Sequence, residues 1–318
     1  MANFELIFDL GSAYVSAALK KDGFTDKRPA VVAIGDGDQI VAVGVDALRM
    51  ANAVGSAVKL SNPILEGAIV DVEGAKALIS ALLNRLVNYK MSVFSRYNVT
   101  CAVPCGMISS DKSAIEALFL SLGAKQVLFV ETPIADSRQL FHEFRVKSGV
   151  VVNIGYDCAD LAIVTSNAIA AGCTLYHAGR HLTEAIMKKI ENKYLIKLSF
   201  EAAEYLKLNC ASLYPNDSTI VTVSGKNTQS GVVEKVNISS KELYDTVVDF
   251  VRKYARVILS LVASVREDLA GLVRTGGVLL CGGGAKLAGL DMFLQSELNM
   301  SVNLAAFPDD VTTKGLLA

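Results

Sequence analysis

The sequence predicts an α/β fold of two related domains that face each other across a cleft. The first observation is an internal repeat, because residues 149–164 have the same pattern as residues 4–19, half a chain earlier. Each copy reads as an apolar strand, then Asp or Asn, an apolar residue, Gly, a short polar turn and a second apolar strand. The second observation is that each copy precedes further strands and then alternating helical and strand patterns. Two such halves form related α/β domains.

The repeated segments are expected to be β-hairpins. Their glycine turns bring backbone N–H groups to one point, and two facing turns of this kind can bind a chain of phosphates. Two ordinary buried hairpins are the alternative. One copy alone would favour that alternative, whereas two copies half a chain apart favour a paired site.

The first half is expected to alternate strands and helices after its hairpin Phe4–Leu19. Apolar periodicity, turn residues and caps define each segment. The expected elements are two strands within 29–44, a helical pattern over 46–59, a helix over Glu73–Tyr89, a strand at Tyr97–Val103, a helix over Ser110–Gly123, a strand at Lys125–Val130 and a helix that ends at about Phe144.

The second half repeats this order with a longer helix. Ser239 and Glu242 have the spacing of a capping box, which predicts the start of an amphipathic helix that continues to about Leu269. The other expected elements are a strand at Ala168–Tyr176, a helix from Ala178 to about Glu191, a helix over Phe200–Cys210, strands at Ser218–Gly225 and Gly231–Ile238, a strand at Val278–Cys281, a helix over Leu287–Leu298 and a strand at Val302–Ala305.

The composition is that of a globular protein with two filled cores. The chain has 318 residues, of which 52% are hydrophobic. Its 31 Lys and Arg balance 32 Asp and Glu, so we expect no nucleic-acid partner. Six cysteines without a Cys-x-x-Cys pair argue against zinc. The N-terminus lacks the pattern of a signal peptide and no segment is long enough to cross a bilayer, so we expect a cytoplasmic protein.

Six stretches, taken together, resemble the motifs of a known family. They are Asp9–Ala13, Gly67–Asp71, Ala102–Gly106, Val127–Ala135, Ala203–Lys207 and Cys281–Ala285. In this order they are similar to motifs of the actin superfamily, most closely of its bacterial MreB-like branch. The first is similar to the first phosphate loop, the fifth to the helix whose Glu and Lys hold ribose and adenine, and the last to the adenosine loop.

The resemblance implies an actin-like ATPase fold, in which two related ribonuclease H-like domains surround a nucleotide cleft. Domain I would comprise residues 1–147 with a subdomain inserted at about 29–65, and domain II residues 148–318 with one inserted at about 181–239. It also implies ATP or ADP as ligand with Mg²⁺. The implied partners are the protein itself in a head-to-tail filament, the inner face of the cytoplasmic membrane and membrane-bound shape proteins, in a cell-shape role.

The resemblance also implies which residues contact the nucleotide. They are Asp9, Gly11, Ser12, Ala13, Asn153, Gly155, Tyr156, Asp157, Gly179, Arg180, Glu204, Lys207, Gly282, Gly283, Gly284 and Ala285. Asp9 would also hold Mg²⁺ through water. For Glu204 and Lys207 the alternative is a surface ion pair three residues apart on one helix.

The phosphate side departs from the family pattern. Where the family has Asp-Ile-Gly-Gly-Gly-Thr-Thr, residues 153–159 carry Asn153, Tyr156 and Asp157, so a Mg²⁺-directing carboxylate and two glycines are replaced. Thr132 stands where the family has the Glu that orients water, and threonine cannot act as a base at neutral pH. We therefore expect nucleotide binding with weak or absent hydrolysis. The chain also ends soon after Lys314-Gly315, before the usual final helix of the family.

A membrane contact is implied at the segment 91–94. It occupies the position of the MreB loop that dips into lipid, with Val93 and Phe94 as inserting residues and Lys90 and Arg96 at the headgroups. The alternative is that Phe94 folds back onto domain I.

The sequence leaves two other functions within the superfamily open. One is a small-molecule kinase, although no Asp is placed as a base for a sugar hydroxyl. The other is a scaffold or chaperone-like protein that does not polymerise. The sequence leaves the second open, because filament interfaces in this superfamily have no readable motif.

Overall fold

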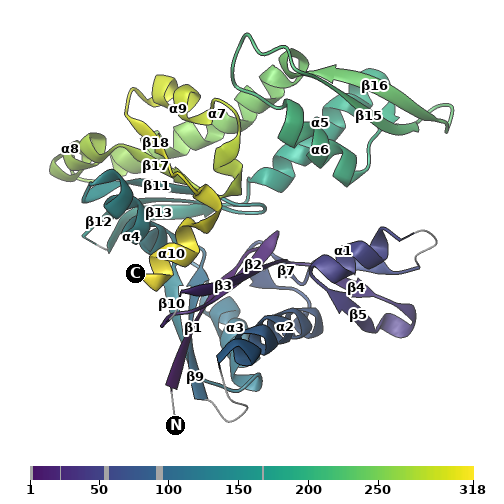
Figure 1. The fold of residues 1–318 in the computed structure, drawn as a ribbon. Coiled ribbons are helices and arrows are strands. Elements are labelled where there is room, and N and C mark those ends of the chain that lie inside the picture. The colour runs from purple at the N-terminus through teal and green to yellow at the C-terminus, as the bar shows by residue number, and fades with distance from the viewer. Residues whose placement is uncertain (1–2, 22, 54–56, 91–95, 167) are drawn as a thin grey trace.

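The computed structural model describes residues 3–21, 23–53, 57–90, 96–166 and 168–318, which form two lobes (Figure 1). Each lobe contains one five-stranded sheet. The first sheet has the order β10-β9-β1-β2-β3 and the second β13-β12-β11-β17-β18. Their strands are β1 Asn3–Leu10, β2 Tyr14–Leu19, β3 Phe24–Pro29, β9 Arg96–Val103, β10 Ala124–Glu131, β11 Ser148–Ile154, β12 Ala159–Thr165, β13 Ala168–Leu175, β17 Val278–Cys281 and β18 Val302–Leu304.

The two sheets have the same topology. In the first, β1 pairs antiparallel with β2 and parallel with β9, and in the second β11 pairs antiparallel with β12 and parallel with β17. A third antiparallel strand follows each hairpin, β3 in one sheet and β13 in the other. The repeat predicted from residues 4–19 and 149–164 is therefore confirmed as a structural repeat.

Two helices, α4 Thr132–Phe144 and α10 Val311–Leu317, lie between the sheets (Figure 1). Strand residues alternate between the two faces of each sheet, as the two-residue period requires. Leu6 and Phe8 face one core, whereas Ile7 packs in another with residues of α4 and α10. The middle layer is therefore shared by both halves.

The outer faces of the sheets are covered by the remaining helices. Apolar side chains of α2 Val72–Lys90 and α3 Ser109–Ser121 pack on the first sheet. Those of α5 Gly179–Tyr194, α7 Ser240–Ser264, α8 Glu267–Gly276 and α9 Leu290–Leu298 pack on the second. Within the described ranges, no helix combines the length and apolar character needed to span a membrane.

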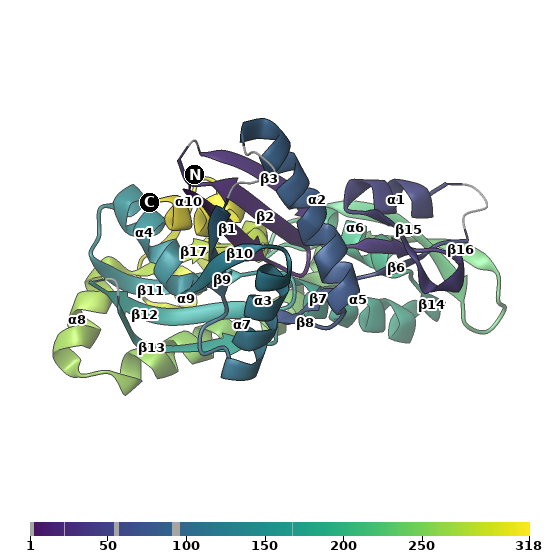
Figure 2. The same ribbon diagram turned by 90° about the horizontal axis from the view of Figure 1, so that it is seen from below.

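Two small sheets project to the same side of the molecule, to the right in Figures 1 and 2. One contains β4 Val32–Ile34, β5 Ile40–Val43 and β6 Lys59–Ser61, next to helix α1 Val45–Ala51. The other contains β14 Ile196–Lys197, β15 Ile220–Asn227 and β16 Val233–Ser239, next to helix α6 Phe200–Cys210. A two-stranded hairpin, β7 Ile64–Leu65 and β8 Ala68–Ile69, follows the first of them.

Three expected helices differ from the structure. The pattern over 46–59 forms a helix only to Ala51, because residues 59–61 pair as β6 with β4. The long helix from Ser239 ends at Ser264, because the backbone of Val265 is extended with φ −98° and ψ 162°, and α8 follows separately. The helix expected at Leu287 begins at Leu290, after Gly289 with a φ of +77°.

The capping box expected at the start of α7 is formed only in part. The Ser239 hydroxyl accepts from the backbone N–H of Glu242 as predicted, but the Glu242 carboxylate accepts from the Tyr194 hydroxyl. At the C-terminal end, residues 311–317 form a helix, α10. The helix packs on α4 and on β1.

Candidate functional site

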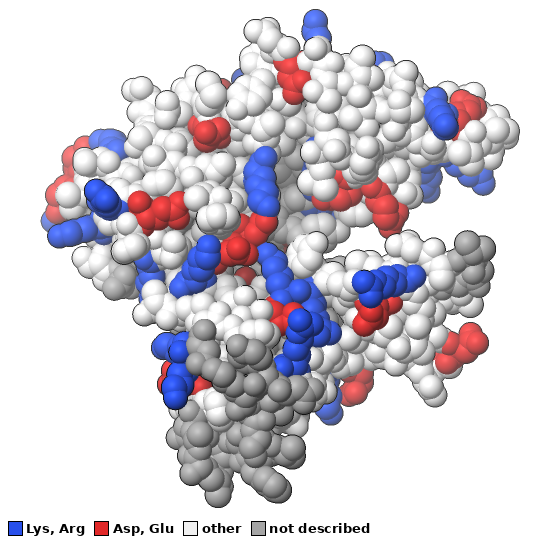
Figure 3. Space-filling view, in the orientation of Figure 1, with Lys and Arg blue, Asp and Glu red and all other residues white. Residues whose placement is uncertain are grey.

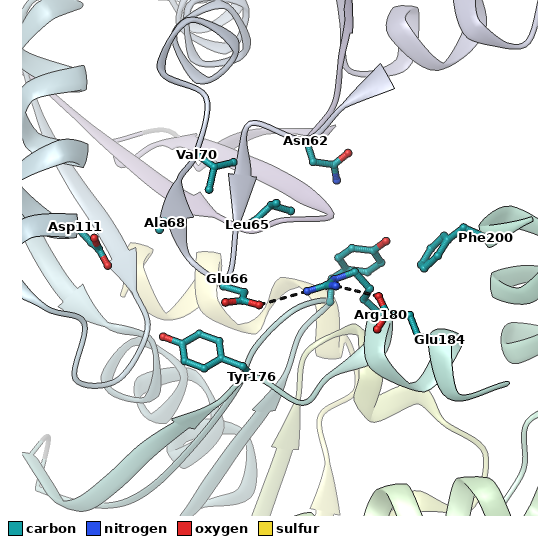
Figure 4. Close-up of a pocket in the computed structure, with 11 residues that line it drawn as sticks. Asn62, Leu65, Glu66, Ala68, Val70, Asp111, Tyr176, Arg180, Glu184 and Phe200 are labelled. Carbon is teal, nitrogen blue, oxygen red and sulfur yellow. Dashed lines mark hydrogen bonds and ion pairs between the residues drawn. The ribbon is translucent and has the colours of Figure 1, made fainter. Parts of the chain in front are cut away.

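A cavity of about 660 Å³ lies between the two halves of the chain (Figure 4). Its lining residues come from both halves and are Asn62, Leu65, Glu66, Ala68, Val70, Asp111, Tyr156, Tyr176, Arg180, Glu184 and Phe200. The face shown in Figure 3 is hollowed on its right-hand side, between the upper and the lower half of the molecule. Positive and negative side chains are interspersed on this face. The cleft is therefore present, and Tyr156 and Arg180 are the predicted residues that line this cavity.

The second glycine turn, residues 155–158, is hydrogen-bonded to the start of α5. The N–H of Gly155 donates to the carbonyl of Cys158 at 2.9 Å, which closes the turn. The N–H groups of Gly179 and Arg180 donate to the carbonyls of Gly155 and Tyr156, at 3.1 and 2.7 Å. Because these donors serve the loop itself, the helix N-terminus is used to hold the turn and not left open for an anion.

Asp157 forms a buried ion pair within the turn. Its side chain is 1% exposed, and its Oδ1 accepts from Nε of Arg180 at 2.5 Å. The Arg180 guanidinium also contacts Glu184 at 2.9 Å and Glu66 at 3.4 Å (Figure 4). The Asp157 hydrogen bond is the main cause that raises the pKa of Arg180. The extra negative charge expected at Asp157 is therefore neutralised by a cation of the same half.

Glu66 connects this ion pair to the first half of the chain. It lies in the turn between β7 and β8 with a φ of +53°, beside Gly67 at +79°. Two positive φ values are typical of a two-residue hairpin turn that favours Asn-Gly, so glutamate is strained there. Its N–H donates to Oδ2 of Asp157 at 3.2 Å. Asp157 therefore holds both halves together at the cleft.

The Tyr156 ring leans away from the turn towards α6. It meets Phe200 edge to face, with ring centroids 6.2 Å apart. Burial is the main cause that raises the pKa of Tyr156 to about 12. The ring fills space between the second turn and α6, where the family pattern would have glycine.

Glu204 and Lys207 form an ion pair against the start of α5. The Lys207 ammonium lies 2.7 Å from the Glu204 carboxylate and donates to the carbonyl of Gly179 at 3.0 Å. The Thr183 hydroxyl donates to the same carboxylate. Desolvation lowers the pKa of Lys207. The pair therefore belongs to the second turn and is more buried than an ordinary surface pair.

The first glycine turn is shaped by its own backbone. A Cβ at Gly11 would lie 2.7 Å from the carbonyl oxygen of Tyr14, so the tight β1–β2 turn excludes a side chain. Ser12 is buried, and its carbonyl accepts from Nδ2 of Asn62 at 3.2 Å. The carbonyl of Ala13 accepts from the N–H of Ala30.

The glycine stretch after β17 packs on β11. A Cβ at Gly282 would lie 2.4 Å from Oδ1 of Asn153, and one at Gly284 would lie 2.3 Å from the Ile154 side chain. Ala285 is buried, whereas Gly283 is exposed. The glycines are thus required by packing, and Gly283 is the member of this stretch that is open to a ligand.

Three carboxyl groups with raised pKa values lie on different elements, Asp9 on β1, Asp136 on α4 and Asp160 on β12. Burial raises the pKa of Asp9 to about 6, of Asp136 to about 7 and of Asp160 to about 6. The charge of Asp9 also raises the pKa of the other two. Asp160 accepts from the N–H of Cys105 at 2.9 Å, a second contact between the halves.

The position expected to orient water has no carboxylate. The Thr132 hydroxyl donates to the carbonyl of Val103 at 3.0 Å. The neighbouring carboxylate, Glu131, accepts from the N–H of Gly106 at 2.7 Å. Both side chains therefore form hydrogen bonds with the backbone at the end of β9 and just after it. The expected membrane residues Val93 and Phe94 lie outside the described residues.

Sequence reasoning missed Glu66 and Asp136. Glu66 was detectable as a non-glycine residue beside Gly67 between apolar pairs, which is a hairpin signal. Asp136 was detectable as a charge four residues before Leu140, on the buried face of an amphipathic helix.

Two topologically equivalent sheets, a shared helical layer and a cleft between glycine turns define a protein of the actin-like class. A solved structure of MreB5 of Spiroplasma citri bound to ADP superposes with a TM-score of 0.90 at 24% identity, covering 99% of this chain and 95% of that one. The MamK double helical filament superposes with a TM-score of 0.83 at 16% identity, covering 99% and 98%. These similarities show the fold.

Within that class, this chain belongs to the MreB/Mbl protein family, whose model matches residues 3–318. It is 27% identical over 310 residues to the cell shape-determining protein Mbl of Bacillus subtilis (strain 168), covering 96% of this chain and 92% of the relative. It is 25% identical over 322 residues to the cell shape-determining protein MreB of Escherichia coli (strain K12), covering 99% and 92%.

Proposed function

We propose that this chain is a nucleotide-binding, filament-forming protein with a role in cell shape and with little ATP hydrolysis. The observation that carries the proposal is the pair of glycine turns, one in each half, in a chain of the MreB/Mbl family. The relatives named above are cell shape-determining proteins, and MreB5 of Spiroplasma citri is described bound to ADP and to AMPPNP. We place the protein in the cytoplasm, at the inner face of the membrane.

The nucleotide would lie between the two turns and the Gly283 side of the cleft. Gly11–Ala13 would present backbone N–H groups to the phosphates, as compact turns do. The N–H of Gly155 stays bonded to the carbonyl of Cys158 and shapes the second turn. The Glu204–Lys207 pair would face the sugar and base. The division at residues 147 and 148 into two domains is part of this proposal, because closure of one half on the other would sense the ligand.

Asp9 and Asn153 fit a hydrated Mg²⁺ held through water. Mg²⁺ prefers oxygen ligands and keeps several of its waters. Asp9 is a desolvated carboxylate with a raised pKa, which a cation would stabilise in its charged form. In the described part of the chain, no group of three or more His, Cys, Asp or Glu is placed to hold a metal. The ion would therefore depend on the phosphates, whose negative charge it compensates.

Hydrolysis by the native chain is expected near the detection limit, while nucleotide affinity is retained. Thr132 supplies no base, Asn153 supplies no carboxylate, and Tyr156 replaces a glycine of the second turn. Loss of one such group costs roughly a hundredfold in rate, and losses within one site do not simply add. A phosphate-release assay measures the rate, and calorimetric titration with ATP and ADP measures affinity. Robust turnover contradicts the proposal, as does the absence of binding by both nucleotides.

Head-to-tail self-association is the second expected result. A head-to-tail contact does not close on itself and so generates filaments. Sedimentation with and without ATP, followed by negative-stain microscopy, should give a pelleted fraction that contains filaments. A chain that stays monomeric in analytical ultracentrifugation at high concentration with every nucleotide would instead be a scaffold.

Membrane attachment through residues 93 and 94 is a separate expectation. The double variant Val93→Ser, Phe94→Ser should reduce co-sedimentation with anionic liposomes about tenfold, since each inserted apolar side chain contributes to binding. A matched control is Val232→Ser, Val233→Ser, which alters two exposed valines next to and within β16. Equal binding of the native chain and the first variant would refute the attachment.

A further inference from the structure

A buried carboxylate on α4 is bonded by three elements of the second half. Asp136 is fully buried, and its Oδ2 accepts from Nδ2 of Asn153 at 2.7 Å and from Sγ of Cys281 at 3.4 Å. Its Oδ1 accepts from the Thr312 hydroxyl at 2.7 Å. These donors come from β11, β17 and α10, so one side chain joins the middle layer to the second sheet.

The same bonds fix the orientation of Asn153. Its Nδ2 donates to both Asp136 and Thr312, the latter at 3.1 Å. With its nitrogen turned inwards, its Oδ1 faces Gly282, where an added Cβ would lie 2.4 Å away. An aspartate at position 153 would have no N–H to donate and would place two carboxyl groups in contact, so that one of them must be protonated or two like charges are buried together. Burial of an unpaired like charge is strongly unfavourable.

We propose that Asp136 is a positioning residue that requires an amide at position 153 and directs its Oδ1 towards Gly282. This chain therefore has its carboxylate on α4, whereas the resembled family has one at the position of Asn153. A Mg²⁺-directing carboxylate in the second turn is then restored only when both positions change. The part of this proposal that concerns Mg²⁺ rests on the proposed nucleotide function, whereas the pairing of Asp136 with Asn153 does not.

The pairing is tested by thermal unfolding without nucleotide. The variant Asn153→Asp should lower the Tm by about 8 °C, scaled from the cost of an unpaired buried charge in a chain of this size. The exchange variant Asp136→Asn, Asn153→Asp restores one amide and one carboxylate and should lie within about 2 °C of the native Tm. If Asn153→Asp gives no folded protein while the exchange variant does, the pairing is equally supported.

A matched control is Asn237→Asp, an exposed asparagine whose Oδ1 accepts from the Thr222 hydroxyl, which an aspartate can replace. Its Tm should change by less than about 2 °C. The pairing is overturned if Asn153→Asp is as stable as the native chain, or if the exchange variant is no more stable than Asn153→Asp.

The link to Mg²⁺ is tested by calorimetric titration with ADP in Mg²⁺ and in EDTA. The exchange variant should bind ADP about tenfold more tightly with Mg²⁺, and the native chain less than about threefold more tightly. Recovery of stability without a gain in Mg²⁺ dependence would overturn the positioning role. Absence of ADP binding by every variant would contradict the proposed function, while the melting temperatures still decide the pairing.

Discussion

Replacing Arg180 by methionine is expected to lower the free energy of unfolding by about 3–5 kcal/mol, because it leaves the Asp157 carboxylate buried without its cation. Asp157 is 1% exposed and the Arg180 side chain 26% exposed, so solvent screens this pair weakly. The remaining donor to Asp157, the N–H of Glu66, comes from a strained turn of the other half. Urea unfolding monitored by circular dichroism measures the change.

The double variant Asp157→Asn, Arg180→Met should recover most of this loss, because neither charge is then left unpaired. Arg274→Met is a matched control. It removes an exposed partner of Glu267 at 3.1 Å, and exposed pairs contribute about 0–1 kcal/mol. If Arg180→Met and Arg274→Met were equally stable, the Asp157 pair would not hold the cleft together.

Replacing Gly315 by alanine is expected to cost about 4 kcal/mol of stability. The added Cβ would lie 1.8 Å from the carbonyl oxygen of Ala135, so α10 must move away from α4. Displacement of α10 also lengthens the buried hydrogen bond from Thr312 to Asp136, and such a bond contributes about 0.5–1.5 kcal/mol. Thermal and urea unfolding measure the loss.

Gly271→Ala gives the matched control in α8. No atom lies within 4 Å of the added Cβ, and alanine favours a helix over glycine by about 1 kcal/mol. This variant should therefore be as stable as the native chain or slightly more so. A Gly315→Ala protein with native stability would show that α10 does not depend on close packing against α4.

Residues of the candidate site were predictable where their neighbours in the sequence identify them. Gly11 and Gly155 stand out because each follows an apolar strand and an acidic or amide residue, and the same order occurs twice. The pairing of Glu204 with Lys207 follows from their spacing of three on one helix. The partners of Asp157 and Asp136 were not predictable, because they lie on other elements of the fold.

Most strands of the two large sheets and most helices were predictable from the sequence alone. Apolar periods of 2 and about 3.6 residues, with Ser239 as a cap, can be read from neighbours along the chain. The break between α7 and α8 was missed because the helical period of apolar residues continues across Val265, whose backbone is extended.

Only the tertiary structure decided how the halves are joined. Asp157 meets the N–H of Glu66, 91 residues earlier, and Asp136 meets Thr312, 176 residues later. Neither contact can be predicted from the spacing of apolar residues along the chain. Both depend on sheet pairing and on the return of α10 to the middle layer, and a buried carboxylate is stable only where those elements bring its donors. The sequence by itself therefore determined two related halves with glycine turns, and the tertiary structure decided which charges close the cleft between them.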